Sequence, residues 1–322
     1  MNTNVLITSA GQRVSLVKAF QKELKKKFPD SIVISVDFNP DLSPACRISD
    51  AYYKICRVND SQYVSELLSI CRENNIGMIV PTIDTELKIL AENKAVFQKE
   101  DIHLIVSDKG FVNSCRDKRL LNDFFSAYNI RFPQPVDKFN PIFPLFIKPY
   151  DGSLSKDIYL IKTEAELTDY HKENPKFMFM EYIDPALYKE YTVDCYYNKD
   201  HQLCCAVPRQ RIAVRSGEIQ KGVTDKNNII DYLNQKVATI PGAVGCITTQ
   251  LFFNKASNDI VAIEINPRFG GGYPLSYEAG ANYPKMLIEE YFENKIITYT
   301  DDWEDQLLML RYDAEVLVRN YE

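Results

Sequence analysis

The stretch Glu264-Ile265-Asn266-Pro267-Arg268-Phe269-Gly270-Gly271-Gly272 carries two oxygen donors, a fixed positive charge and a glycine run. In an extended segment alternate side chains share a face, so Glu264, Asn266 and Arg268 project to the same side. Carboxylate and carboxamide oxygens suit Mg²⁺ beside substrate phosphates, and an arginine stabilises charge on a phosphoryl group in transfer. The stretch therefore predicts a site for Mg²⁺ and a polyphosphate, although the same residues could simply end a strand and enter a turn.

The composition is that of a mildly acidic chain with room for more than one domain. Its 322 residues are 45% hydrophobic, which is enough for two or three domains with a binding cleft between them. The 38 Lys and Arg against 44 Asp and Glu give a net charge of −6 without a long basic run. No apolar stretch approaches bilayer length, and the N-terminus has no signal-peptide pattern. We therefore expect a cytoplasmic protein that binds neither nucleic acid nor membrane.

The cysteines and histidines offer little for metal or nucleophilic chemistry. The eight cysteines include no Cys-x-x-Cys pair, and His103, His171 and His201 are far apart in the chain. This pattern disfavours structural zinc, a transition-metal site and a histidine-based triad. We expect buried, reduced thiols.

The first third alternates short apolar runs with amphipathic segments. We predict strands at 5–7, 32–36, 78–80 and 103–106, helices at 13–27, 61–74 and 85–98, and a loop after the second strand. Continuous apolar strands separated by helices are typical of a parallel sheet covered on both faces. The fold class is thus α/β, with a doubly wound domain at residues 1–108. Its first turn contains a single glycine, Gly11, which argues against a nicotinamide-dependent dehydrogenase.

Polar residues follow the predicted strands of this domain, where ligands of open α/β sheets bind. They are Ser9, Gly11, Arg13, Asp37, Asn39, Asp84 and Glu86. Asp84 and Glu86 could receive the ammonium group of a substrate, but Asp84 could equally be the N-cap of the following helix.

The remaining chain, 109–322, predicts an α+β domain. A helix at 117–128 and a proline-rich linker precede a strand-loop-strand-helix-strand unit at about 142–183, the layout of a small lid, whose helix we place at 163–172. Antiparallel strands are predicted at 191–197, 203–207, 245–253 and 260–265, with a helix at 229–239.

Two lysines in this part could contact phosphates. Lys148 ends a strand immediately before a loop with Gly152, Ser153 and Ser155, whose amides and hydroxyls can wrap an anion. Lys118 begins the preceding helix, where helix amides add to an anion site, although taken alone it could be a solvated first-turn lysine.

A nucleoside could bind next to them. Backbone groups of Glu181, Tyr182 and Ile183 can pair with an adenine edge, and the carboxylate of Glu190 can accept both ribose hydroxyls. Gln250 on one strand would converge with Glu264 and Asn266 on the next.

In this order the motifs resemble those of the ATP-grasp superfamily. Within it, the chain is similar to carbamoyl-phosphate synthase large-chain-like proteins and to amino-acid ligases such as the pyrrolysine-pathway lysine ligase. The resemblance covers essentially the whole chain and implies an N-terminal doubly wound domain followed by a two-part ATP-grasp fold with a small lid. It also implies ATP and one or two Mg²⁺ as cofactors, with Mn²⁺ as a substitute.

The resemblance implies a role for each motif. Phosphates of ATP would contact Lys118, Lys148, Gly152, Ser153 and Ser155; adenine would contact Glu181, Tyr182 and Ile183; ribose would contact Glu190. The metal ligands would be Gln250, Glu264 and Asn266. Catalytic stabilisation of the transferring phosphate would come from Arg268 and Lys148, together with Arg209 or Arg211. Asp157 departs from the family, which usually has glycine there, and this places tight closure of the phosphate loop in doubt.

The implied activity is a carboxylate-amine ligase that forms an acyl-phosphate and releases ADP. For the acid we expect contacts from Gly271 and Gly272, where the backbone can approach closely, and from a helix that begins at Ser276. Asp84 and Glu86 would receive the amine.

Two other interpretations stay open. The chain could be a non-catalytic or partner-dependent nucleotide-binding protein, for which Asp157 is the motivating observation. It could also be a kinase-like subunit that phosphorylates bicarbonate or carbamate. The sequence names neither the acid nor the amine, and a homodimer is expected only from the habit of the superfamily.

Overall fold

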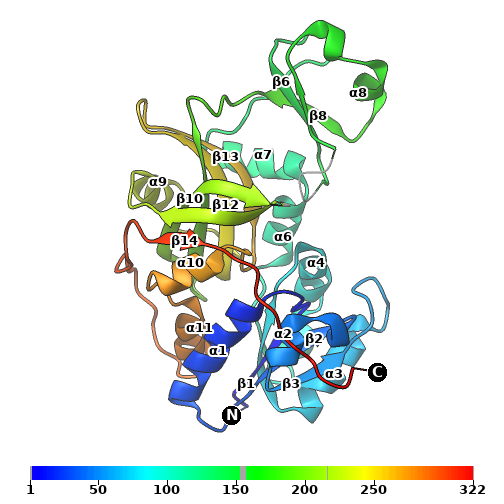
Figure 1. Ribbon diagram of the computed structural model, residues 1–322, viewed down its shortest axis with the longest axis vertical. Helices are drawn as coiled ribbons and strands as arrows, with labels where there is room; N and C mark the ends of the chain where they lie inside the picture. Colours follow the sequence, from blue (N-terminus) through cyan, green and yellow to red (C-terminus); the bar gives the residue numbers. More distant parts are fainter. Residues whose placement is uncertain (1, 153–156, 216, 322) are drawn as a thin grey trace.

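The computed structural model describes residues 2–152, 157–215 and 217–321. Three sheets follow one another along the long axis of the molecule: a five-stranded sheet at one end, a six-stranded sheet in the middle and a three-stranded sheet at the other end (Figure 1). This arrangement confirms the mixed α/β and α+β class. No helix among the described residues is long and apolar enough to cross a membrane.

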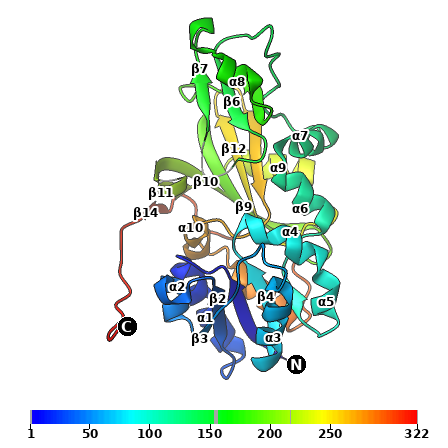
Figure 2. The ribbon, with the colours of Figure 1, turned by 90° about the vertical axis from the view of Figure 1, so that its right-hand side faces the viewer.

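The N-terminal sheet is parallel, with strand order β3-β2-β1-β4-β5, and helices lie on both of its faces (Figure 2). Its central strands are almost wholly buried, which explains their continuous apolar sequences. The strands are β1 (Asn4–Thr8), β2 (Val33–Asp37), β3 (Ala51–Lys54), β4 (Ile76–Pro81) and β5 (His103–Leu104). The helices are α1 (Val14–Lys27), α2 (Pro44–Ile48), α3 (Tyr63–Glu73), α4 (Asp84–Glu92) and α5 (Lys94–Gln98), with a 3₁₀ turn at Pro40–Leu42. The predicted doubly wound sheet is confirmed.

Two local predictions in this part are wrong. The segment expected to be a loop after β2 contains α2, which Ser43 caps by accepting a hydrogen bond from the Cys46 amide at 3.2 Å, and the edge strand β3. The edge strand is half exposed and lacks a long apolar run. The single helix expected at 85–98 is divided at Asn93, whose backbone leaves the helical region between α4 and α5.

The lid is a three-stranded antiparallel sheet with order β7-β6-β8 and its own small apolar core. It contains β6 (Leu145–Pro149), β7 (Tyr159–Ile161), α8 (Asp169–Glu173) and β8 (Phe177–Glu181). The helix predicted at 163–172 is instead a 3₁₀ turn, Glu164–Glu166, followed by α8. Leu167 and Thr168 are extended between them, and the Thr168 amide donates to His171 Nδ1 at 3.2 Å, which starts the second helix.

The six-stranded sheet is antiparallel and runs in the order β13-β12-β9-β10-β11-β14. Its strands are β9 (Lys189–Tyr197), β10 (Leu203–Arg215), β11 (Glu218–Thr224), β12 (Gly245–Asn254), β13 (Asp259–Asn266) and β14 (Leu308–Leu310). The accompanying helices are α6 (Lys109–Arg116), α7 (Lys118–Ala127), α9 (Ile229–Val237), α10 (Tyr273–Glu278) and α11 (Tyr283–Tyr291). The prediction made β10 too short and missed β11, because charged residues along both strands interrupt the apolar pattern.

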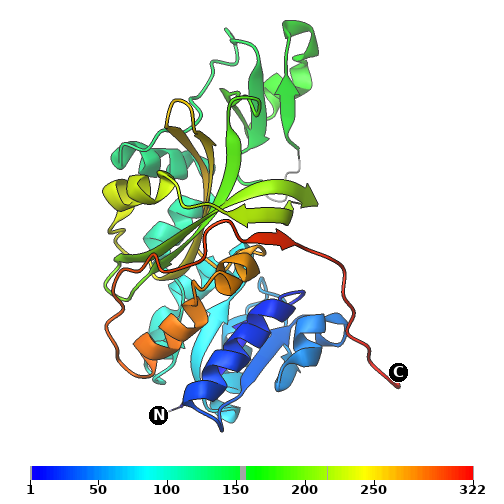
Figure 3. The same cartoon turned by 60° about the vertical axis from the view of Figure 1, so that its left-hand side comes forward.

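The first and last parts of the chain share one core. Helices α10 and α11 lie beside α1 (Figure 3), and the rings of Phe20 and Phe269 meet edge to face at 6.0 Å. The Tyr277 hydroxyl donates to Glu23 at 2.9 Å. Packing therefore continues across the proposed boundary between residues 1–108 and 109–322, and that division, like the limits of the lid, stays a prediction.

Asp194 on β9 is fully buried and joins the strands and helices around it. Its carboxylate accepts hydrogen bonds from Arg209 Nη2 of β10 at 3.0 Å, Thr248 Oγ1 of β12 at 3.2 Å and Ser276 Oγ of α10 at 2.6 Å. The Tyr283 hydroxyl of α11 donates to its backbone carbonyl at 2.7 Å. Because Arg209 is only 1% exposed, removal of the carboxylate would leave a buried charge without its counter-ion.

We expect Asp194→Ala to lower the free energy of unfolding by about 3–5 kcal/mol, the usual effect of breaking a buried ion pair. Urea unfolding followed by circular dichroism measures this. Asp200→Ala is the control, since Asp200 is exposed and its carboxylate makes no hydrogen bond or ion pair among the described residues; it should change stability by less than about 0.5 kcal/mol. Equal stability of the two variants would refute the structural importance of Asp194.

Candidate active site

A cleft of about 530 Å³ lies between the lid, the six-stranded sheet and the loop after β13. This volume is in the range of small-molecule sites. The predicted site residues that line it are Asp84, Lys118, Lys148, Gly152, Glu181, Tyr182, Ile183, Glu190, Arg209, Arg211, Gln250, Glu264, Asn266, Arg268, Gly271 and Gly272. Glu86 and Ser276 are not in its lining, and neither are the other candidates after the parallel strands, Ser9, Gly11, Arg13, Asp37 and Asn39. Ser153 and Ser155 lie outside the described residues.

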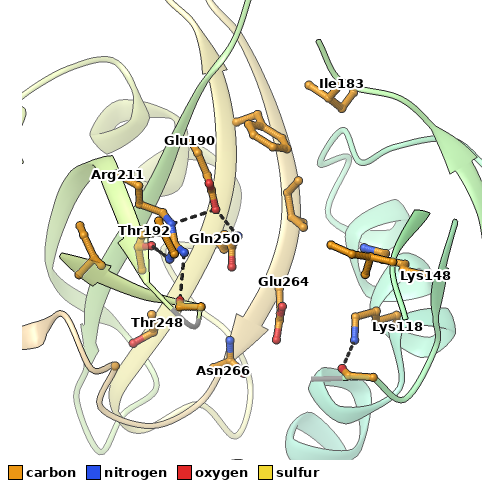
Figure 4. A pocket seen from close by; sticks show the side chains of 18 of the residues that line it. Lys118, Lys148, Ile183, Glu190, Thr192, Arg211, Thr248, Gln250, Glu264 and Asn266 are labelled. Carbon is orange, nitrogen blue, oxygen red and sulfur yellow. Dashed lines mark hydrogen bonds and ion pairs between the residues drawn. The ribbon is translucent and has the colours of Figure 1, made fainter. Parts of the chain in front are cut away.

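Two lysines form one wall of the cleft (Figure 4). Lys118 is the first residue of α7, and its Nζ donates to the carbonyl of Gly152 at 2.7 Å. Lys148 is on β6 and has no hydrogen bond or ion pair among the described residues. Burial lowers the pKa of Lys118, and burial together with repulsion from Lys118 lowers the pKa of Lys148 to about 8. A polyanion between the two ammonium groups would relieve this repulsion.

The oxygen donors lie on the opposite wall (Figure 4). Gln250 on β12 is directly paired with Glu264 on β13, and Asn266 follows two residues later on the same strand and face. The electrostatic attraction of Glu264 reaches both Lys118 and Lys148 across the cleft. One carboxylate and two carboxamides fit Mg²⁺, which completes its coordination with phosphates and water. Among the described residues, there is no group of three His, Cys, Asp or Glu side chains that could hold a metal ion.

Glu190 fixes the orientation of Gln250. The Gln250 amide nitrogen donates to Glu190 Oε1, which leaves the Gln250 carbonyl oxygen for another partner. The same Glu190 oxygen lies 3.0 Å from Arg211 Nε, and Arg211 also donates to Thr192 Oγ1 at 3.2 Å and to the Gly217 carbonyl at 3.1 Å. Glu190 is thus partly committed to protein partners, and its contact with both ribose hydroxyls stays a prediction.

The end of the cleft that is predicted to bind the base is apolar. The cleft here is lined by Phe146, Met180, Phe252 and Ile263. Glu181 directs its carboxylate away from this surface, since Arg131 Nη2 donates to it at 2.8 Å and the Gln134 amide at 3.2 Å. The prediction concerns the backbone of Glu181, Tyr182 and Ile183, and it stays a prediction for all three, although the Glu181 amide already donates to the Gln134 carbonyl at 2.7 Å.

The proposed role of Glu86 in receiving an amine is wrong. Glu86 is completely buried, and its carboxylate accepts hydrogen bonds from the amides of Thr82 and Ile83 at 2.7 and 3.1 Å, from Ser9 at 2.9 Å and from Tyr63 at 3.0 Å. It closes the first turn of α4, and no lone pair faces the cleft.

Asp84 lies in the cleft, but it does not cap α4. It is the first residue of the helix, and its carboxylate accepts a hydrogen bond from Arg268 Nη2 at 2.7 Å. This ion pair connects the N-terminal sheet with the loop after β13. Asp84 therefore holds Arg268 in place instead of presenting a free carboxylate.

The expectation for Ser276 is also wrong. Helix α10 begins at Tyr273, so Ser276 lies inside it and is fully buried, with its hydroxyl committed to Asp194. The predicted contact of Gly271 and Gly272 with the acid stays a prediction, and the structure shows a packing reason for both glycines. A Cβ on Gly271 would collide with the Glu218 carboxylate, and a Cβ on Gly272 would collide with Arg209 Nη1.

The side chains of Arg209 and Glu218 thus occupy the space that side chains at positions 272 and 271 would fill, and both line the cleft. Arg209, predicted to stabilise a phosphate, is held in this wall by Asp194. The sequence did not predict Glu218 as a cleft residue, because it begins β11, whose charged sequence does not resemble a strand. Gly271 and Gly272 were the available signal, since adjacent glycines indicate that another group approaches the backbone closely.

Comparisons with known proteins agree with this geometry. A family model described as "PylC-like, N-terminal domain" matches residues 5–105, and one described as "ATP-grasp in the biosynthetic pathway with Ter operon" matches residues 173–309. Comparison with curated protein sequences gives no match.

Several solved structures have the same fold. The biotin carboxylase domain of 2-oxoglutarate carboxylase from Hydrogenobacter thermophilus, determined with MgADP and bicarbonate, has a TM-score of 0.72 at 12% identity over 96% of this chain and 74% of its own. N5-carboxyaminoimidazole synthetase from Staphylococcus aureus, complexed with ADP, has a TM-score of 0.68 at 15% identity over 89% of this chain and 77% of its own. L-amino acid ligase from Bacillus licheniformis has a TM-score of 0.66 at 14% identity over 91% of this chain and 74% of its own.

The parallel N-terminal sheet, the lid and the cleft with its two lysines and facing oxygen donors lie within or between the matched segments. Residues 5–105 thus belong to the PylC-like N-terminal domain family, and residues 173–309 belong to an ATP-grasp family.

Proposed function

We propose that the chain is an ATP- and Mg²⁺-dependent ligase that joins a small carboxylic acid to an amine through an acyl-phosphate and releases ADP. The observation that carries the proposal is the opposition of Lys118 and Lys148 to Gln250, Glu264 and Asn266 across one cleft, with Arg268 near Glu264. The similar structures include an L-amino acid ligase and an N5-carboxyaminoimidazole synthetase, and both names are compatible with this proposal.

Each wall of the cleft would have a separate task. The two ammonium groups would neutralise the phosphates of ATP, and the apolar end would hold the base. Gln250, Glu264 and Asn266 would hold Mg²⁺, which neutralises charge on the transferring phosphate when bound. Arg268, which Asp84 keeps in position, would contact the transferred phosphate on the side away from the lysines.

Phosphorylation gives a carboxylate a better leaving group. An amine cannot displace oxide from a carboxylate, but it can displace phosphate from an acyl-phosphate. The lid would cover this intermediate, because water in the cleft would hydrolyse it. No side chain has to form a covalent bond with the substrate, which agrees with burial of seven of the eight cysteines.

The residue roles, the second Mg²⁺, replacement by Mn²⁺, the homodimer and the cytoplasmic location remain predictions. Bicarbonate or carbamate as the phosphate acceptor is a second candidate, because the structure from Hydrogenobacter thermophilus is a complex with MgADP, ADP and bicarbonate.

Release of ADP and phosphate by purified protein with Mg²⁺-ATP tests the proposal. The assay pairs pooled amino acids and small carboxylic acids with pooled amines, and a separate reaction contains bicarbonate alone. We expect ADP release that requires one acid and one amine. Release with bicarbonate alone would favour the second candidate, and ATP binding without turnover in any pool would favour a non-catalytic or partner-dependent nucleotide-binding protein.

We expect Lys148→Ala and Glu264→Ala each to reduce ADP formation at least about 100-fold, since each removes a charge that faces the transferring phosphate. Steady-state ADP release measures the effect. Lys162→Ala is the matched control, because Lys162 is an exposed lysine directly after β7 in the same lid. Full activity of either cleft variant would disprove the assignment of the phosphate site.

Nucleotide affinity should depend on pH through Lys148. Its pKa of about 8 in the free protein means that the side chain is charged below this pH and loses its charge above it. If the bound nucleotide requires the charged form, Kd should be constant near pH 7 and increase about tenfold by pH 9. Titration with a non-hydrolysable ATP analogue measures this.

Lys148→Arg provides the control for this pH dependence. Arginine stays charged over the whole range, so the change near pH 8 should disappear in the variant. An unaltered pH profile in Lys148→Arg would assign the dependence to another group, such as Lys118, whose pKa is also lowered by burial.

A further inference from the structure

The carboxylates of the cleft divide into committed and uncommitted groups. Asp84 is paired with Arg268, Glu181 with Arg131, and Glu190 with Arg211 and Gln250. Glu218 and Glu264 have no hydrogen bond or ion pair among the described residues. Two carboxylates therefore remain available for ligands.

These two carboxylates lie in different electrostatic surroundings. Glu264 attracts Lys118, Lys148 and Arg268, which places it at the phosphate end. Glu218 interacts electrostatically with Arg268 and Arg13, without an ion pair to either. Arg268 thus interacts with both Glu218 and Glu264. Glu218, which does not act on either lysine, lies at the end of the cleft remote from them.

The position of Glu218 is built into the fold. It is the first residue of β11, and its carboxylate occupies the space that a side chain at position 271 would fill. The loop that carries Arg268 thus passes directly under the Glu218 carboxylate. A carbonyl carbon activated next to Arg268 would therefore lie near an anion that has no partner among the described residues.

We propose that Glu218 forms the amine subsite of the ligase: it binds the ammonium group of the second substrate and removes a proton from it. The inference rests on the proposed function and names its nucleophile as an aliphatic amine that arrives protonated. Glu181, Glu190 and Asp84 cannot take this role without losing their partners, and Glu264 faces the phosphate end.

The proposed step balances. The ammonium nitrogen gives one proton to the Glu218 carboxylate, and its lone pair then attacks the carbonyl carbon of the acyl-phosphate. The new C–N bond forms as the C–O bond to phosphate breaks, and phosphate leaves with that electron pair. Phosphate takes the second nitrogen-bound proton, and Glu218 returns its proton to solvent.

Hydroxylamine separates activation of the acid from use of the amine, because it is largely uncharged at pH 7 and needs no base. Wild-type protein is incubated with Mg²⁺-ATP, hydroxylamine and each common L-amino acid or small carboxylic acid, and ferric chloride detects the hydroxamate. The acid that reacts is then offered ammonium chloride, methylamine and the amino acids as nucleophiles, and amide is measured by mass spectrometry.

For Glu218→Gln we expect hydroxamate formation within about threefold of wild type and amide formation reduced about 100-fold or more at pH 7, the usual contribution of a general base. Amide formation should recover in part as pH approaches the pKa of the amine. Glu278→Gln, an exposed glutamate on α10, is the control and should leave both reactions unchanged.

Two results would overturn the inference while the proposed function stands. Unchanged amide formation in Glu218→Gln would exclude the amine subsite, and equal loss of hydroxamate and amide would show that Glu218 supports the arginines instead. Absence of hydroxamate with every acid in the wild-type protein would contradict the proposed ligase itself, and the amine subsite with it.

Discussion

The buried carboxylate of Asp194 determines how the parts around the cleft fit together. A charge with no access to water is tolerated only when hydrogen bonds and a counter-ion surround it, and here Arg209, Thr248 and Ser276 supply them. These partners come from β10, β12 and α10, so the two neighbouring strands and the helix after the glycine run cannot shift independently. The wall that carries the proposed metal ligands and the loop that carries Arg268 are therefore both connected to Asp194.

The position of Arg209 beside Asp194 also explains why glycines follow Arg268 in the sequence. With Arg209 held against Asp194, its guanidinium occupies the space next to Gly272, and Glu218 occupies the space next to Gly271. Side chains at these two positions would move either the loop or the two charges. Gly271 and Gly272 therefore leave room for side chains that approach from β10 and β11, and Gly270 lies against Thr248 of β12.

Sequence reasoning succeeded where the pattern is local and failed where partners come from distant segments. Continuous apolar runs predicted the buried parallel sheet, and the spacing of Glu264, Asn266 and Arg268 placed three cleft residues on one strand end. Glu86 resembles a cleft carboxylate in sequence, but its partners Ser9 and Tyr63 are supplied by other elements, and only the fold brings them together. β11 was missed because a strand that lines a charged cleft has no apolar alternation on that face.

The aspartate at position 157 can be judged from the backbone. It has φ of 54°, in the left-handed region that favours glycine and that aspartate tolerates better than most residues. Its side chain is exposed. The substitution thus keeps the conformation for which the family's glycine is suited, and water can screen the carboxylate. The departure from the family pattern consequently gives weaker support to a non-catalytic nucleotide-binding protein than the sequence suggested.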